Sequence, residues 1–316
     1  MLTINFKNFT VRQKLGPYFL LYVLVCLFPC AQGETLQSLS LYFSQGISDF
    51  CVSNNVIYII SEDYTLYKYQ HNELVKKTKI SQKVSKRTQT GLINLPNITC
   101  YANNLYVHES VNKVKVYDRD FNFLKTLPIV PLGGFIYIEN DQVIYTTYVN
   151  HIGKIYYYDL AKDKNVFISD GNDKEDVNYR FLTKAIFFND KYYLYLNSIG
   201  KPIKDKVFIF DSKFNSVKGD KSILDVFLEL DNGKLIIKNN TVFYEKSIMH
   251  WDNKKRKRTF KTIFGSYDIE NRQNNEIIKL DNVLVKDFFL EDDILYYLSI
   301  IDGIIYSKRR VRPTHH

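Results

Sequence analysis

Apolar and polar positions follow a repeating pattern along this chain. Each repeat opens with a turn rich in Asn and Asp, continues as a strand of aromatic and β-branched residues, turns again and ends as a second such strand. Asn and Asp tolerate the left-handed backbone of tight hairpin turns, and aromatic and β-branched side chains suit a pleated, half-buried surface. Four clear copies and two weaker ones occupy residues 53–69, 102–118, 139–159, 188–211, 230–252 and 291–309. With no sustained 3.6-residue apolar stripe in the sequence, the pattern predicts an all-β chain.

The spacing of the repeats predicts a six-bladed β-propeller of four-stranded antiparallel blades. The leading turn residues of the six copies are Asn54, Asn103, Asn140, Asn189, Asp231 and Glu291, which lie 49, 37, 49, 42 and 60 residues apart. A four-stranded blade takes about 40–50 residues. The long last interval contains residues 265–285, which could hold an additional hairpin, so seven blades is the alternative.

Two further features bear on how the blades are built and joined. The second strand of four copies ends in an aromatic residue and Asp, at Tyr117-Asp118, Tyr158-Asp159, Phe210-Asp211 and Trp251-Asp252. We expect this Asp to start the next turn. Residues 36–43 (LQSLSLYF) have strand character but no blade of their own. We expect this N-terminal segment to pair with the final blade and close the ring, which removes the exposed edge strands of an open array.

The first 33 residues have the features of a signal peptide. They contain cations but no Asp or Glu, an apolar run at residues 18–28, and Ala31 and Gly33 at the −3 and −1 positions of a signal-peptidase site. An uncleaved anchor is the alternative, although a span needs about 20 apolar residues. Lipid-modified Cys30 is another alternative, but the preceding residues lack the small side chain of a lipobox. We therefore predict a leader over residues 1–33, a single propeller domain over residues 34–316, and export to the periplasm or the exterior.

Repeats of this kind resemble the exported six-bladed β-propellers, in outline those of the NHL-repeat and TolB-like groups. The resemblance covers nearly all of residues 34–316. The Gly-His and Trp-Asp marks of WD-repeat blades are missing, apart from Trp251-Asp252. The resemblance implies the fold and does not identify a ligand.

The predicted mature chain contains two cysteines, Cys51 and Cys100. Each lies three residues before an Asn of an opening turn, so the two should occupy equivalent sites in neighbouring blades. Facing sheets lie about 10 Å apart, whereas a disulfide needs Cα atoms within about 7 Å. An oxidising compartment would permit a bridge, but this geometry predicts two buried free thiols that pack as small hydrophobic residues.

The sequence contains none of the common catalytic or phosphate-binding motifs. His108-Glu109 is the leading candidate for an acid–base pair, and His151 lies in the equivalent region of the next repeat. Adjacent strand residues point to opposite faces of a sheet, so we predict that His108 is a solvated turn residue. The acidic segment 170–179 departs from the EF-hand spacing and is interpreted as a hydrated loop. We expect no metal and no cofactor.

The densest charge cluster is formed by Lys254, Lys255, Arg256, Lys257 and Arg258. We place it in a turn and the start of an outer strand, where lysines protect an edge from strand addition. The alternative, functional interpretation is that the cluster is a docking patch for an anionic surface or polymer. Removal of the three leader cations lowers the net charge from +9 to +6, which is only mildly basic and does not indicate a specific nucleic-acid partner.

Three functions remain open from the sequence. The leading one is an exported, non-catalytic propeller that acts as a scaffold for a protein or glycan partner. The second is an enzyme, a hydrolase or lyase acting on glycans or lactones, with its site at the mouth of the central channel. The third is the binder of anionic surfaces. Asn97 and Asn239 also match the pattern of glycosylation acceptors.

Overall fold

The computed structural model describes residues 37–39, 46–81, 95–108, 113–132, 135–149, 152–170, 179–199, 206–221, 223–225, 234–252, 257–299 and 304–309. The chain divides into two units, residues 1–35 and residues 36–316. All described residues belong to the second unit, so the predicted leader lies outside them. None of the described residues forms a helix that is long and apolar enough to cross a membrane.

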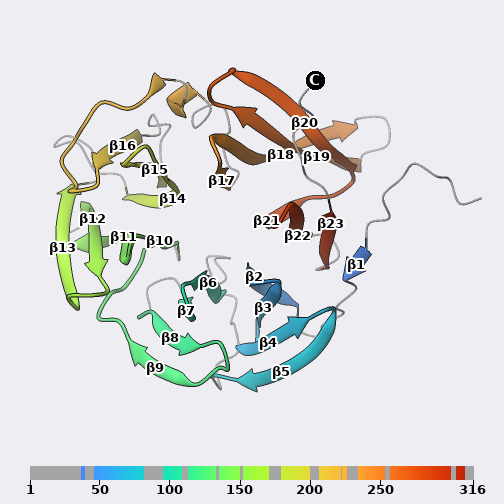
Figure 1. Ribbon diagram of the computed structural model, residues 1–316, viewed down its shortest axis with the longest axis horizontal. Helices are drawn as coiled ribbons and strands as arrows, with labels where there is room; N and C mark the ends of the chain where they lie inside the picture. Colours follow the sequence, from blue (N-terminus) through green and yellow to red (C-terminus); the bar gives the residue numbers. More distant parts are fainter. Residues whose placement is uncertain are drawn as a thin grey trace, which may run out of the picture. The chain divides into compact units, whose positions relative to one another are not determined.

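The second unit is a six-bladed β-propeller, as the repeat pattern predicts (Figure 1). The first blade contains β2 (Ile47–Ser53), β3 (Val56–Ser61), β4 (Thr65–Gln70) and β5 (Glu73–Lys79). The second contains β6 (Asn97–Tyr101), β7 (Asn104–His108), β8 (Lys115–Asp118) and β9 (Phe123–Thr126). The third contains β10 (Tyr137–Glu139), β11 (Gln142–Val149), β12 (Ile152–Asp159) and β13 (Lys164–Asp170).

The remaining blades follow the same antiparallel order. The fourth contains β14 (Tyr179–Phe188), β15 (Lys191–Ile199) and β16 (Lys206–Asp211), and the segment after β16 takes the outer position through an isolated bridge between Phe210 and Ser216. The fifth contains β17 (Leu235–Lys238), β18 (Thr241–Asp252), β19 (Lys257–Asp268) and β20 (Gln273–Asp281). The sixth contains β21 (Val285–Glu291), β22 (Ile294–Ser299), β23 (Ile305–Arg309) and β1 (Gln37–Leu39).

The N-terminal strand closes the ring, as predicted. β1 pairs antiparallel with β23, with Gln37 opposite Ser307 and Leu39 opposite Ile305. Figure 1 shows the two strands side by side although they come from opposite ends of the sequence. The outer edge of the sixth blade is therefore supplied by the start of the unit and its inner strands by the end.

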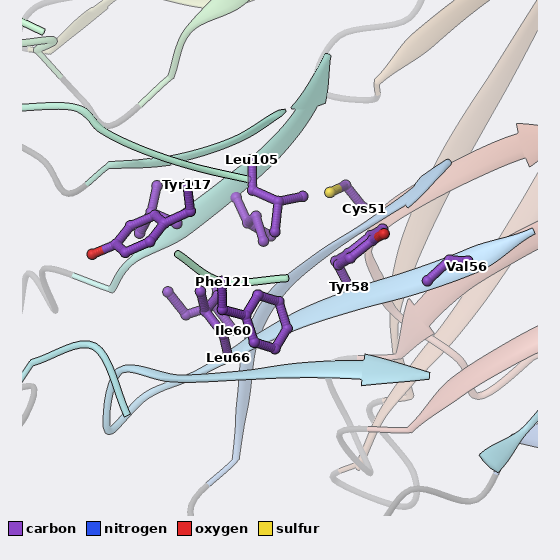
Figure 2. Close-up of a cluster of buried hydrophobic side chains, with 10 residues drawn as sticks. Cys51, Val56, Tyr58, Ile60, Leu66, Leu105, Tyr117 and Phe121 are labelled. Carbon is purple, nitrogen blue, oxygen red and sulfur yellow. The ribbon is translucent and has the colours of Figure 1, made fainter. Parts of the chain in front are cut away.

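In the part of the chain that the structure describes, six apolar clusters hold the blades together, one between each pair of neighbours around the ring. Tyr58 packs with Leu105 in the cluster between the first and second blades (Figure 2). Its neighbour in the strand, Ile57, packs with Leu298 in the cluster between the first and sixth blades. Successive strand residues point to opposite faces, and both faces of each blade are covered. The second strands, such as β3 with the sequence VIYIIS, are therefore apolar at nearly every position, whereas outer strands such as β5 and β9 are largely exposed.

The opening turns use left-handed backbone, as their Asn and Asp content predicts. Positive φ occurs at both residues of Asn54-Asn55, Asn140-Asp141, Asn189-Asp190 and Asp292-Asp293. In the fifth blade the turn is Asn239-Asn240, so the sequence assignment of this turn to Asp231, which lies outside the described residues, is wrong. Residues 265–285 complete the fifth blade and begin the sixth, and they do not form a seventh.

The Asp at the end of a third strand starts the next turn, as expected. Asp118 Oδ1 accepts hydrogen bonds from the backbone N–H groups of Asp120 at 2.8 Å and Asn122 at 2.9 Å. Asp211 makes the same pattern in the fourth blade. In the fifth blade the corresponding residue is Asp268, and Trp251-Asp252 instead ends β18, the second strand.

The prediction of free thiols is wrong, because Cys51 and Cys100 form a disulfide with a Cα–Cα distance of 5.7 Å. The first hairpin closes at the Ser53–Val56 pair, but the second closes at Tyr101–Asn104. Cys51 thus lies two residues before its closing pair and Cys100 only one. A one-residue difference in register reverses the face to which a side chain points. The two cysteines therefore face each other across the inner strands of neighbouring blades.

Candidate functional site

The innermost strands of all six blades line one cavity, of about 390 Å³. These strands are β2, β6, β10, β14, β17 and β21, so the cavity occupies the central channel. The residue four positions before the end of each innermost strand lies in the cavity wall. The six equivalent residues, here called the channel ring, are Asp49, Asn97, Phe135, Lys184, Lys234 and Asp287. The propeller thus brings one side chain of each blade to a shared site.

Three charged members of the channel ring follow a β-bulge. The register of the innermost strand shifts between Ile47 and Asp49 in the first blade, and in the same way before Lys184 and Asp287 in the fourth and sixth. A bulge adds a residue to one strand and re-aims the side chain that follows. The bulges lie at equivalent heights in three blades, which places the charged residues of these blades in the channel wall.

The carboxyl group of Asp49 lies in a buried environment within the channel ring. Its side chain is buried, and its Oδ2 accepts a hydrogen bond from the backbone N–H of Ile98 at 2.9 Å. Burial and the negative charge of Asp287 raise the pKa of Asp49 to about 7, against the opposing charge of Lys286. Near neutral pH the neutral and the ionised forms of this carboxyl group are therefore both populated.

The lysines of the channel come from three blades. Lys234 Nζ lies 3.1 Å from Asp287 Oδ1 and 3.3 Å from the ring centroid of Phe289. Lys286, the bulge residue of the sixth blade, donates a hydrogen bond to the backbone oxygen of Ser48. Lys184 is buried, with its Nζ 4.5 Å from the ring centroid of Tyr195. The ring therefore presents charges of both signs close to aromatic faces.

The prediction that His108 is a solvated turn residue is wrong. His108 ends β7 and is only 3% exposed, because its backbone pairs with Asn97 of the channel ring. Burial lowers the pKa of His108 to about 3, so the imidazole is neutral at physiological pH. Its Nδ1 has no hydrogen-bond partner in the part of the chain that the structure describes. Glu109 and His151 lie outside the described residues.

The predicted cationic patch lies largely outside the described residues. Lys254, Lys255 and Arg256 are not described, and Lys257 and Arg258 are placed only by their backbone at the start of β19. The patch therefore follows β18 at the end of the β18–β19 hairpin, whose tip extends beyond the paired parts of β17 and β20. Near this end, Met249 is 58% exposed and Trp251 is 54% exposed.

The other predicted polar features are placed as follows. The acidic segment begins at Asp170, the last residue of β13, and residues 171–178 are not described. The two glycosylation patterns differ in position, because Asn97 belongs to the channel ring and Asn239 lies in an exposed hairpin turn. Within the described ranges, no group of three or more His, Cys, Asp and Glu residues could hold a metal ion.

Sequence reasoning missed the channel ring, although the sequence contains its signal. Each ring residue lies at a fixed distance before its opening turn, so alignment of the six turns would place the six positions in one column. Asp49, Lys184 and Asp287 are charged residues that directly precede apolar or aromatic residues of their strands, Phe50, Ala185 and Phe288. Two errors in the sequence interpretation prevented this alignment. The fifth turn was assigned to Asp231 instead of Asn239, and the second turn was placed at Asn103, one residue after its first position, Ala102.

Comparison with known proteins supports the fold alone. No protein-family model and no curated protein matches the chain. The solved structure of U3-55K has a TM-score of 0.50 at 9% identity and covers 86% of this chain and 97% of its own. BamB from Moraxella catarrhalis gives 0.47 at 10% identity, covering 87% of each chain. The Dos1 propeller gives 0.46 at 14% identity, covering 83% of this chain and 76% of its own. The NHL-repeat and TolB-like resemblance stays a prediction.

Proposed function

We propose that this chain is an exported, non-catalytic binding protein whose central channel receives part of a glycan. The single observation that carries the proposal is the channel ring, in which six blades contribute carboxyl, amide, ammonium and aromatic groups to one cavity. Ligand sites in proteins are concave, mostly apolar and fitted with a few convergent polar groups. This cavity has that composition.

The size of the cavity favours a glycan over a protein as the partner in the channel. About 390 Å³ falls within the range of small-ligand pockets, about 300–1,000 Å³, and leaves no room for a folded domain. A glycan end can enter such a space, because a sugar ring offers hydroxyl groups to Asp49 and Asn97 and a C–H face to Phe135. The propeller then serves as the rigid frame that fixes these groups.

Export is part of the proposal. The Cys51–Cys100 disulfide lies in the core between two blades. Disulfides persist in oxidising compartments and are rare in the cytosol. The disulfide thus supports the periplasm or the exterior as the location, in agreement with the predicted leader.

The proposal is tested by filling the channel. In Thr99→Trp the new ring projects from a residue of the cavity wall, and we expect affinity for a glycan hit from an array to fall at least about tenfold. Thr126→Trp, on the exposed outer strand of the same blade, is the matched control and should bind as the unmodified chain does. Unchanged binding by Thr99→Trp would contradict the channel as the site. Cleavage of the glycan would support the hydrolase or lyase alternative. The raised pKa of Asp49 favours this alternative, because such carboxyl groups are common in catalytic sites.

We propose an anionic surface as the second partner, at the end of the β18–β19 hairpin. The exposed side chains of Met249 and Trp251 favour it, because apolar and aromatic residues beside a cationic run are typical of segments that rest on membrane interfaces. Reversal of the charges at residues 254–258 should abolish salt-sensitive binding to vesicles of anionic lipid. Persistence of that binding would remove this candidate.

A further inference from the structure

His108 is a polar side chain that the protein buries without pairing its Nδ1. The residue belongs to the wall of the channel cavity, and Nδ1 has no hydrogen-bond partner in the ranges that the structure describes. Buried polar atoms in folded proteins are normally paired, and each exception calls for an explanation. A molecule that enters the cavity can supply the partner for this nitrogen.

The strand pairing shows which side of the second blade carries His108. His108 lies opposite Asn97, and Tyr106 lies opposite Thr99. Directly opposed residues, and residues two positions apart in one strand, share a face of the sheet. Tyr106 packs with Ile138 of the third blade. His108 and Thr99 therefore lie on the face of the second blade that is turned towards the third blade.

The third blade supplies the apolar side of this part of the cavity. Phe135 and Ile136, directly before β10, both line the wall. Thr99 lines it from the second blade and adds a hydroxyl group. Pockets for small ligands combine apolar walls with a few polar groups that fix the orientation of the ligand. A sugar ring matches this arrangement, because it has hydroxyl groups around its edge and C–H groups on its faces.

The neutral imidazole of His108 suits a hydroxyl group as its partner. Burial lowers the pKa of His108, so one ring nitrogen is a donor and the other is an acceptor at physiological pH. A hydroxyl group both donates and accepts, so it can pair with Nδ1 in either tautomer. A carboxylate only accepts and fits one tautomer, and a hydrocarbon fits neither.

We infer that His108 is the specificity-determining residue of the channel, and that its imidazole forms a hydrogen bond with one hydroxyl group of the bound sugar. This inference rests on the proposed glycan-binding function and names the residue that selects the ligand. A sugar that lacks this hydroxyl group leaves the imidazole unpaired and binds more weakly.

The stability of the chain without ligand gives the first test. His108→Phe keeps a planar ring and removes both nitrogens, and His108→Leu removes them with an aliphatic side chain. We expect at least one of these variants to melt no lower than the unmodified chain, because Nδ1 forms no hydrogen bond with the described part of the protein. A fall of more than about 4 °C in both variants would show that His108 serves the fold, and would overturn the inference.

Calorimetry with deoxygenated sugars gives the second test. Glucose, galactose, mannose and N-acetylglucosamine are titrated into the full chain, and the tightest binder is compared with its monodeoxy forms. We expect removal of one particular hydroxyl group to weaken binding about three- to tenfold, the range of a single uncharged hydrogen bond. In His108→Phe the parent sugar should bind as weakly as that deoxy form, and the deoxygenation should cost nothing further.

Tyr106→Phe is the control, because Tyr106 lies on the same face of the same strand and does not line the cavity. This variant should keep the full cost of deoxygenation. If a folded His108→Phe chain also keeps that cost at every position of the sugar, the inference is overturned and glycan binding remains. Absence of binding by these sugars and by every glycan of the array would overturn the proposed function as well.

Discussion

At the scale of single residues, the channel keeps a carboxyl group where its charge is poorly solvated. Asp49 is buried in the channel wall, near Asp287 and Lys286 of β21 and Lys234 before β17. Its carboxyl group accepts a hydrogen bond from the backbone N–H of Ile98 in β6. A group so placed costs stability when it ionises. Binding groups are often held at such a cost, because the ligand supplies the missing partner.

The pH dependence of stability should report this residue. The folded pKa of Asp49, about 7, lies above its ordinary value of 3.8, so its contribution to stability is fully present below about pH 4 and is lost as pH rises towards 7. Asp49→Asn removes the ionisation. We expect the variant to be more stable than the unmodified chain at pH 8, by up to about 4 kcal/mol, with the difference shrinking towards pH 4. Urea unfolding across this range is the measurement, and a pH-independent difference would contradict the assignment.

Ala102 shows how a single residue can conceal the register. Its φ is 49°, in the left-handed region that Asn and Gly tolerate and Ala disfavours, and it holds the first position of its turn. The following Asn103-Asn104 led the sequence interpretation to place the turn one residue too late. A slip of one residue would reverse the faces of Ile98 and Cys100, so burial of the strand outweighs the local preference of Ala.

Ala102→Asn should therefore stabilise the chain. Asn adopts the left-handed backbone more readily, and we expect the free energy of unfolding to rise by about 0.5–1 kcal/mol. Ala161→Asn is the control, because Ala161 also lies in a turn but does not itself have positive φ, and the substitution should gain nothing. Equal effects of the two substitutions in urea unfolding would show that left-handed strain at Ala102 is not the cause.

At the scale of elements, the disulfide links two blades that the chain enters in succession. Cys51 and Cys100 are separated by 49 residues, and both lie on innermost strands. A cross-link across a loop of this length restricts the unfolded chain and stabilises the folded one by about 2–4 kcal/mol. A separation of about 10 Å applies to sheets stacked face to face. Neighbouring blades form a wedge, and their innermost strands lie closer, with 5.7 Å between the Cα atoms of Cys51 and Cys100.

Removal of the disulfide tests its role. The double variant Cys51→Ala/Cys100→Ala should unfold with a free energy lower by about 2–4 kcal/mol. The unmodified chain under reducing conditions should move towards the same value. Labelling of the denatured, unreduced chain with a maleimide should find neither of these thiols free, and detection of both would refute the bridge.

The closing strand is the second element that joins distant parts of the chain. β1 adds the outer strand of the sixth blade through backbone pairing with β23. Proline lacks the N–H that a ladder needs, and the double variant Ser38→Pro/Leu39→Pro removes a hydrogen bond whichever of the two residues donates. We expect the melting temperature to fall by about 2–6 °C. An unchanged melting temperature would mean that the pairing of β1 with β23 contributes nothing to stability.

At the scale of the whole molecule, the sequence pattern predicts the fold but does not predict the site. Turn chemistry and strand composition repeat along the chain, so they identify six blades without knowledge of contacts. The channel ring depends on register, β-bulges and the meeting of six strands, none of which is local. His108 illustrates the difference: its neighbours in sequence suggest a turn, but pairing with Asn97 places it in the channel wall.

The most direct measurement is a crystal structure of the chain with a bound glycan, chosen from the hits of the array. Density for the sugar should lie inside the channel ring, against the ring of Phe135 and with a hydroxyl group within hydrogen-bond distance of His108 Nδ1. Density on an outer surface of the blades, with the channel of the same crystals free of sugar, would contradict the account.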